Sequence, residues 1–266
     1  MSKIKYGSQT YPWRMNIKKF HGQVPHMADT LIKAGFTGME AEICMLEDYY
    51  TDWQKLKDLL DEKQIAFAAL AVHEDWLLPE ETDGERERLD EAIEFLTHFP
   101  TAKLMLGHVA ADPVRVHNLY EKQVNQLKCI SAIAQRAAEA GIVTVFHPNS
   151  GENSIFRYES DYHIMFDTLY SKGIGYAPDA GHMLNGGIDP LKVIREHRDI
   201  VQHVHFKDMT PDHVWATMGE GIGDFKSIVD FLADTGYQGW IMTEDESPDA
   251  EQDSDGVVLA DGAYMK

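Results

Sequence analysis

Short, mostly apolar runs alternate along the chain with longer segments in which apolar residues recur at helical spacing. In the segment 53–62, for example, Leu56, Leu59 and Leu60 recur at i, i+3 and i+4, which predicts an amphipathic helix. The expected strands are 4–10, 38–42, 65–73, 103–108, 142–146, 174–177, 201–206 and 239–243. The expected helices are one ending over 27–34, with Gly35 as its C-cap, and 53–62, 85–99, 119–140, 158–171, 190–197 and 225–233.

Eight strands separated by helices predict an α/β fold, namely a single (β/α)₈ TIM barrel. The strands read as nearly continuous apolar runs, as a parallel sheet covered on both faces requires. An open doubly wound sheet would carry a glycine-rich loop after its first strand, whereas this turn reads QTYPW over residues 9–13. No linker interrupts the chain, so we expect one domain over residues 1–266, with at most a short final helix in the acidic segment 247–266.

The composition and net charge of the chain disfavour several classes of function. The net charge of −20 disfavours binding to a nucleic-acid backbone. No apolar run approaches the ~20 residues that span a membrane, and the first residues lack the layout of a signal peptide. Cys44 and Cys129 lie in no metal-finger spacing, so we expect two reduced, buried thiols in a cytoplasmic protein.

Polar residues of metal-ligand type end four successive strands, and in a (β/α)₈ barrel these ends form the active-site face. They are His147 and Asn149 in VFHPNSG, Asp179 and His182 in YAPDAGH, His203, His205, Lys207 and Asp208 in HVHFKD, and Glu244 in MTEDE. We therefore expect one divalent metal ion bound by His147, Asp179, His205 and Glu244. Two imidazoles and two carboxylates suit Mn²⁺, which we favour, or Co²⁺, Fe²⁺ or Zn²⁺.

Each of these residues has a simpler interpretation when it is taken alone. A single histidine at a strand end, such as His73 or His108, is more often hydrogen-bonded structure than a ligand. Lys207 is a candidate for proton transfer or for a salt bridge to Glu244 or Asp208.

The motifs SQTYPW, GFTGME, DAGH, HVHFKD, GEGIGDF and GYQGWIMTE are spread over nearly the whole chain. Together they resemble the sugar phosphate isomerase/epimerase superfamily of xylose-isomerase-like TIM barrels, and the second half is most similar to inosose dehydratase (2-keto-myo-inositol dehydratase). The resemblance implies the same four metal ligands, and it implies that His182, Lys207 and Glu40 line the substrate pocket. There Glu40 would bind substrate hydroxyls, with a buried structural acid as the alternative. Trp13 would provide an apolar wall for a sugar ring, with simple packing in the core as the alternative.

The sequence departs from that pattern in three ways. Most epimerases and isomerases of the superfamily carry Glu at the strand-5 metal position, where this chain has His147, and this disfavours proton transfer by two glutamates. Asn149, a candidate substrate-binding residue, stands where dehydratases often carry a second His. The segment after the fourth strand is shorter than in typical inosose dehydratases, and the terminal helix is truncated.

Several functions fit these residues. The first is a metal-dependent lyase that forms an enolate from a keto-sugar or keto-cyclitol and expels water, with Lys207 and His182 transferring protons. The alternatives are an aldose–ketose isomerase or sugar epimerase, and a lyase that expels the aglycone of a 3-keto glycoside. A non-enzymatic sugar-binding subunit and a nuclease of the endonuclease IV type are weaker candidates. We expect a small sugar or cyclitol substrate and a homo-oligomer, either a dimer or a tetramer.

Overall fold

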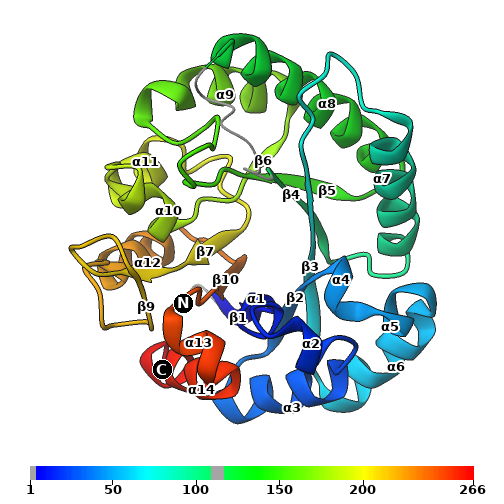
Figure 1. The fold of residues 1–266 in the computed structure, drawn as a ribbon, viewed down its shortest axis with the longest axis vertical. Coiled ribbons are helices and arrows are strands. Elements are labelled where there is room, and N and C mark those ends of the chain that lie inside the picture. Colours follow the sequence, from blue (N-terminus) through cyan, green and yellow to red (C-terminus); the bar gives the residue numbers. More distant parts are fainter. Residues whose placement is uncertain (1–3, 109–116) are drawn as a thin grey trace. The chain divides into compact units, whose positions relative to one another are not determined.

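A computed structural model describes residues 4–108 and 117–266 and divides into two compact units. The first unit comprises Met1–Leu70 together with Val204–Lys266, and the second comprises Ala71–His203. Figure 1 shows their elements, and each unit is described by itself. Whether the whole chain folds as one domain stays a prediction.

Eight strands form one sheet, and they match the predicted strands to within a few residues at each end. They are β1 (Lys5–Gln9), β2 (Gly38–Glu42), β3 (Ala66–Glu74), β4 (Lys103–His108), β5 (Val143–His147), β6 (Gly175–Tyr176), β7 (Val204–Phe206) and β10 (Trp240–Thr243). Their hydrogen-bonded order is β6-β5-β4-β3-β2-β1-β10-β7, and a parallel bridge joins Tyr176 of β6 to Val201, just before β7. This is the strand order of a (β/α)₈ barrel, so the predicted fold class is confirmed.

The first unit contains the N-terminal and C-terminal helices. These are α1 (Tyr11–Arg14), α2 (Ile17–Phe20), α3 (Val24–Ala34), α4 (Ile43–Leu46), α5 (Asp48–Thr51), α6 (Trp53–Lys63), α12 (Phe225–Asp234), α13 (Pro248–Gln252) and α14 (Ser254–Tyr264). A short antiparallel pair, β8 (Asp208–Met209) with β9 (Trp215–Ala216), follows β7. Gly35 ends α3 in the left-handed conformation with φ of 89°, as its predicted C-cap role requires.

The second unit contains α7 (Asp83–Leu96), α8 (Leu119–Glu139), α9 (Glu159–Lys172), α10 (Ala180–Asn185) and α11 (Pro190–Glu196). Helix α7 begins two residues before the predicted start because Thr82 and Glu85 form a capping box. The Glu85 amide donates to Thr82 Oγ1 (3.3 Å), and the Thr82 amide donates to Glu85 Oε2 (2.7 Å). The T-x-x-E signal was present in the sequence.

All five residues of β2 are buried, although two of them are acids. Side chains alternate along a strand, so Met39 and Ala41 share one face while Glu40 and Glu42 share the other. Arg14 pairs with Glu42 at 2.8 Å, and Glu40 contacts His205 at 3.0 Å. The acidic face of β2 therefore carries charge that other strands and helices of the first unit compensate.

The C-terminal segment forms two helices, so the prediction of at most a short final helix is wrong. Helix α14 spans 11 residues and packs along α3, as Figure 1 shows. Few apolar residues are enough to pack this helix against α3, because Val257 and Val258 are buried and Gly262 lets the two backbones approach closely. A Cβ atom built on Gly262 would lie only 2.3 Å from the Ala34 carbonyl oxygen.

Both cysteines are free thiols, as expected, but they differ in burial. Cys129 is buried, whereas Cys44 is exposed on α4, so the expectation of two buried thiols is wrong for Cys44. The apolar side of this one-turn helix is filled by Met45 and Leu46, and Cys44 lies off that side. Within the described residues, no helix combines the length and apolar character needed to cross a membrane.

We expect Gly262→Ala to destabilise the protein by about 1–3 kcal/mol, because the added methyl overpacks the contact between α14 and α3. The free energy of unfolding from urea titration measures this loss. Ala260→Ser, at an exposed position of the same helix, is the matched control and should stay within about 0.5 kcal/mol of the wild type. Equal stability of the two variants would show that the close approach contributes nothing.

Candidate functional site

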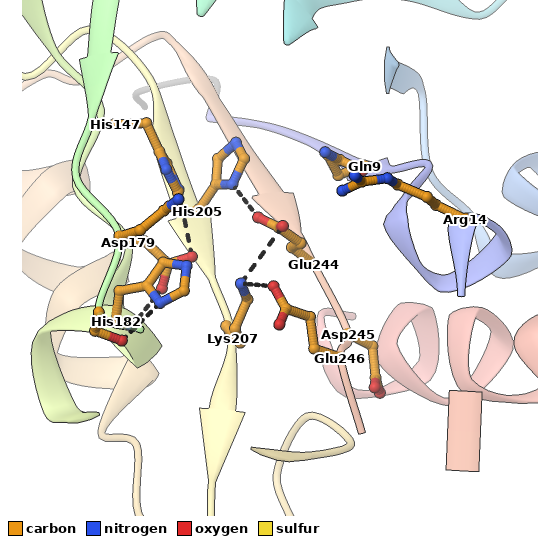
Figure 2. Close-up of polar contacts among 12 residues, drawn as sticks. Gln9, Arg14, His147, Asp179, His182, His205, Lys207, Glu244, Asp245 and Glu246 are labelled. Atoms are coloured by element: carbon orange, nitrogen blue, oxygen red, sulfur yellow. Dashed lines mark hydrogen bonds and ion pairs between the residues drawn. The ribbon is translucent and has the colours of Figure 1, made fainter. Parts of the chain in front are cut away.

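In the second unit, His147 and Asp179 bring two buried ligand atoms together. His147 is the last residue of β5, and Asp179 is the N-cap of α10, where its Oδ1 accepts the His182 amide at 2.8 Å. This bond fixes the carboxylate and leaves Oδ2 3.5 Å from His147 Nε2 (Figure 2). Both residues are at most 2% exposed.

The spacing of these two atoms fits a shared metal ion better than a hydrogen bond. A strong hydrogen bond between an imidazole nitrogen and a carboxylate lies nearer to about 2.8 Å. Bonds of about 2.1 Å to a tetrahedral ion place neighbouring ligand atoms about 3.4 Å apart. The observed 3.5 Å between His147 Nε2 and Asp179 Oδ2 is close to that ligand–ligand distance. The donor types and their spacing therefore suit a divalent cation.

Beside this pair, Ser150 contacts the imidazole of His182. Ser150 Oγ lies 2.8 Å from His182 Nδ1, and Asn185 Nδ2 lies 2.9 Å from the same hydroxyl. The ring of His182 meets that of His147 edge to face, with centroids 5.5 Å apart. A predicted proton-transfer residue and a predicted metal ligand are therefore neighbours, whereas Ser150 and Asn185 were not singled out from the sequence.

Asn149 holds the end of β4, because its Nδ2 donates to the His108 carbonyl at 2.5 Å. His108 itself is buried, with Nδ1 2.8 Å from Gln126 Nε2. Burial lowers the pKa of His108 to about 4, so its ring is neutral near pH 7. These contacts support the structural interpretation of His108, and the predicted substrate contact of Asn149 stays a prediction.

In the first unit, His205 lies between two buried carboxylates. Its Nε2 is 3.0 Å from Glu40 Oε2, and its Nδ1 is 2.7 Å from Glu244 Oε2. Burial opposes a charged imidazole, but the charges of Glu40 and Glu244 outweigh it and raise the pKa of His205 to about 10. Without a cation, therefore, the ring carries a proton on each nitrogen.

Lys207, two residues after His205, is buried. Its Nζ contacts Glu246 at 2.5 Å and Glu244 at 3.4 Å (Figure 2). The salt-bridge partner Glu244 was among the alternatives from the sequence, whereas Glu246 was missed. The run of acids Glu244-Asp245-Glu246 does not by itself indicate which of the three contacts Lys207.

Asp208 was the second candidate salt-bridge partner of Lys207, but its carboxylate is hydrogen-bonded to backbone amides instead. It accepts amide protons from Gly219, Gly221 and Gly223 at 2.9–3.0 Å, and one from Met209 at 2.9 Å. Side-chain atoms would crowd this turn, since a Cβ on Gly221 would lie 2.2 Å from Asp208 Oδ1. The GEGIGDF motif is therefore a loop that wraps around one carboxylate.

Trp13 is completely buried on α1, and its Nε1 donates to Asp255 of α14 at 2.7 Å. The indole thus joins the first βα turn to the C-terminal helix, which is the core-packing alternative, and its role as a sugar wall stays a prediction. The aromatic rings near Lys207 are instead those of Tyr11, at 6.0 Å, and Trp215, at 5.3 Å. A strand-end search missed both because they lie on a short helix and a hairpin.

Comparison with known proteins adds the family. The family model described as "Xylose isomerase-like TIM barrel" matches residues 28–261, most of the chain. The chain belongs to this family. Among curated proteins, inosose dehydratase of Lacticaseibacillus casei is 27% identical over 272 residues, which cover 89% of this chain and 87% of that protein.

Two solved structures share the fold of the present chain at low sequence identity. The IolI protein with a bound zinc atom has a TM-score of 0.78 at 12% identity, covering 98% of this chain and 96% of its own. The D-allulose 3-epimerase from Methylomonas sp. has a TM-score of 0.73 at 19% identity, covering 100% and 98%. The chain is an enzyme of the dehydratase or isomerase/epimerase kind, as predicted.

The lowered pKa of His108 predicts a loss of stability in acid. The ring titrates at about 4 in the folded state and near 6.5 when unfolded, so the unfolded chain binds more protons between these values. The free energy of unfolding should therefore fall as the pH drops from about 6.5 to about 4, by up to about 3 kcal/mol for a shift of this size. Urea titrations across this range measure the slope.

His108→Gln, which keeps a polar side chain but cannot titrate, should flatten that slope. His98→Gln is the matched control at a histidine for which the structure shows no such burial, and it should leave the slope unchanged. Parallel slopes for the wild type and His108→Gln would contradict the prediction.

Proposed function

We propose that His147 and Asp179 of the second unit act with His205 and Glu244 of the first to bind one divalent metal ion. All four are buried and are of the types that could hold a metal. In this fold family the carboxyl ends of successive strands supply one active-site face, which is where each of these residues lies in the sequence. Two imidazoles and two carboxylates favour Mn²⁺, with Co²⁺, Fe²⁺ and Zn²⁺ as alternatives.

Within this proposal, Glu40 is the residue that orients His205. A metal-binding imidazole commonly donates its other ring N–H to a carboxylate, which fixes the ring. Glu40 Oε2 accepts from His205 Nε2 at 3.0 Å and so leaves Nδ1, on the side of Glu244, as the coordinating nitrogen. A substrate contact for Glu40, the other prediction, would use its second carboxylate oxygen.

The reaction that we propose is the loss of water from a keto-cyclitol or keto-sugar. A bound divalent cation would polarise the substrate carbonyl and so acidify the adjacent carbon. A base removes the proton on that carbon, the C–H electron pair becomes the new C=C bond, and the neighbouring C–O bond breaks. The departing oxygen takes up a proton and leaves as water, so the step needs both a proton acceptor and a proton donor.

Lys207 is suited to stabilise negative charge in this reaction. With Glu244 and Glu246 on either side, its amine is held as ammonium, which can donate to an enolate oxygen but cannot accept a proton. Of the two residues expected to transfer protons, Lys207 is therefore proposed as a donor and not as the base. Glu246, which lies against Lys207 and is partly exposed, is the better candidate for accepting the proton.

His182 is the proposed hydrogen-bond donor to the departing hydroxyl, because it lies beside His147. The Lys207 ammonium is the proposed source of the proton that leaves with this oxygen. The observation that carries the dehydratase assignment is His147 itself, an imidazole 3.5 Å from Asp179 at the end of β5. An imidazole cannot serve there as one of two carboxylates that exchange a proton across the substrate. The 27% identity to an inosose dehydratase over most of both chains supports the same reaction.

A sugar isomerase or epimerase is the second candidate. Its support is the fold shared with a D-allulose 3-epimerase and the presence of Glu40, Glu244 and Glu246, any of which could replace the missing carboxylate. Elimination of the aglycone from a 3-keto glycoside would use the same first step as the dehydration. A homo-oligomer in the cytoplasm remains our expectation for its assembly and location.

The metal site predicts a stoichiometry. The purified wild type, dialysed against Mn²⁺ and then against buffer, should retain about one ion per chain by elemental analysis. The double variant His147→Ala/Glu244→Ala should retain almost none, since it loses two of the four ligands. His108→Gln is the control that leaves the ligands intact. Equal metal content in the wild type and the double variant would exclude the site.

The proposed reaction predicts a product with a new chromophore. The Mn²⁺-loaded enzyme, incubated with 2-keto-myo-inositol, should produce an absorbing dione, and Lys207→Met should slow it by about 10²-fold or more. Solvent deuterium entering a ketose without loss of water would instead identify an isomerase or epimerase. If neither change occurs with either substrate class, both assignments fail.

A further inference from the structure

Ser150, in the loop after β5, is a buried hydroxyl between two side chains of α10. It is 1% exposed, and its Oγ lies 2.9 Å from Asn185 Nδ2 and 2.8 Å from His182 Nδ1. Both partners come from one short helix whose N-cap is Asp179. The direction of these hydrogen bonds can be assigned, because some of the groups involved can only donate and others can only accept.

The orientation of Asn185 is fixed by the backbone. Its Nδ2 lies 3.2 Å from the carbonyl oxygen of Ser150, which can only accept a hydrogen bond. The group that faces Ser150 is therefore the NH₂ of the amide and not its oxygen. The same NH₂ contacts Ser150 Oγ, so the hydroxyl accepts from Asn185.

The hydroxyl proton of Ser150 then has one destination. The NH₂ of Asn185 has no lone pair to offer, and among the described residues the other side-chain atom in contact with Oγ is His182 Nδ1. A buried hydroxyl that left its proton without an acceptor would cost about 1–3 kcal/mol. Ser150 therefore donates to Nδ1, and the neutral ring of His182 carries its proton on Nε2.

We propose that Ser150 and Asn185 are positioning residues that hold His182 in the Nε2–H form, so that Nε2–H is the group that donates a hydrogen bond to the substrate. The role of this proton in turnover rests on the proposed function, whereas its position on the ring does not. In the turnover step, His182 Nε2–H would hydrogen-bond to the departing hydroxyl and keep its proton, because a neutral ring that lost this proton would become an imidazolate. Ser150 would remain hydrogen-bonded to Nδ1. Asn185 prevents Ser150 from turning its proton away from the ring.

The location of the proton can be measured without substrate. In ¹⁵N-labelled protein, metal-free or loaded with Zn²⁺, long-range ¹H–¹⁵N correlation spectra distinguish protonated from unprotonated ring nitrogens. At a pH at which the ring is neutral, His182 Nε2 should appear as protonated and Nδ1 as unprotonated. A protonated Nδ1, or two equivalent nitrogens, would overturn the inference.

Asn185→Asp supplies the sharpest variant, because it replaces the donor with an acceptor of the same shape. The Ser150 hydroxyl would then donate to the introduced carboxylate, Oγ would accept from the ring, and the His182 proton would move to Nδ1. Ser150→Ala should remove the bias and Ser150→Thr should restore it, while Ser154→Ala, at a buried serine of the same loop, is the matched control. Retention of the Nε2–H form in Asn185→Asp would count against the relay.

Kinetics separate the relay from the function itself. If the dehydration assay succeeds, Asn185→Asp should lower kcat by about 10²-fold and change KM little, since it misplaces a proton rather than a binding group. A wild type with the expected Nε2–H signal but no activity would defeat the proposed function alone. An active wild type with the proton on Nδ1 would defeat this inference alone.

Discussion

A buried imidazole held between two carboxylates is the interaction on which the first unit's half of the site depends. Taking three ionisable groups out of water is costly, and His205 tolerates it only because Glu40 and Glu244 lie within hydrogen-bond distance of its two nitrogens. Removing one partner would leave an uncompensated charge in a place that water does not reach. The neighbouring Lys207 repeats the arrangement, with Glu244 shared between them.

The strand register makes this interaction possible. Glu40 is aligned with Gln9 of β1, Ser8 of β1 with Thr243 of β10, and Met242 of β10 with His205 of β7. The pairings bring the ends of β2 and β7 to nearly the same level although the residues are 165 positions apart. Because a shift of one residue would turn every side chain to the opposite face, the hydrophobic pattern that fixes the register also fixes the charge pairs.

Much of this could be predicted from the sequence, because the barrel strands are apolar runs and the residues that break them stand out at their ends. His205, Lys207 and Glu244 were found in this way. Ser150 and Glu246 were not, because a serine in a loop or one acid among three carries no signal until its partner is known. The C-terminal helices were underestimated because a count of apolar residues overlooks the close approach that Gly262 permits.

Asp208 binds its loop entirely through backbone amides, and this separates the shape of the loop from the identity of most of its side chains. Three glycines must stay small, but Glu220 and Ile222 between them are exposed and make no contribution to the anchoring bonds. Substitutions at the exposed positions of this loop should therefore leave its backbone path unchanged. The loop is a place in the fold where side-chain chemistry can vary while the backbone stays the same.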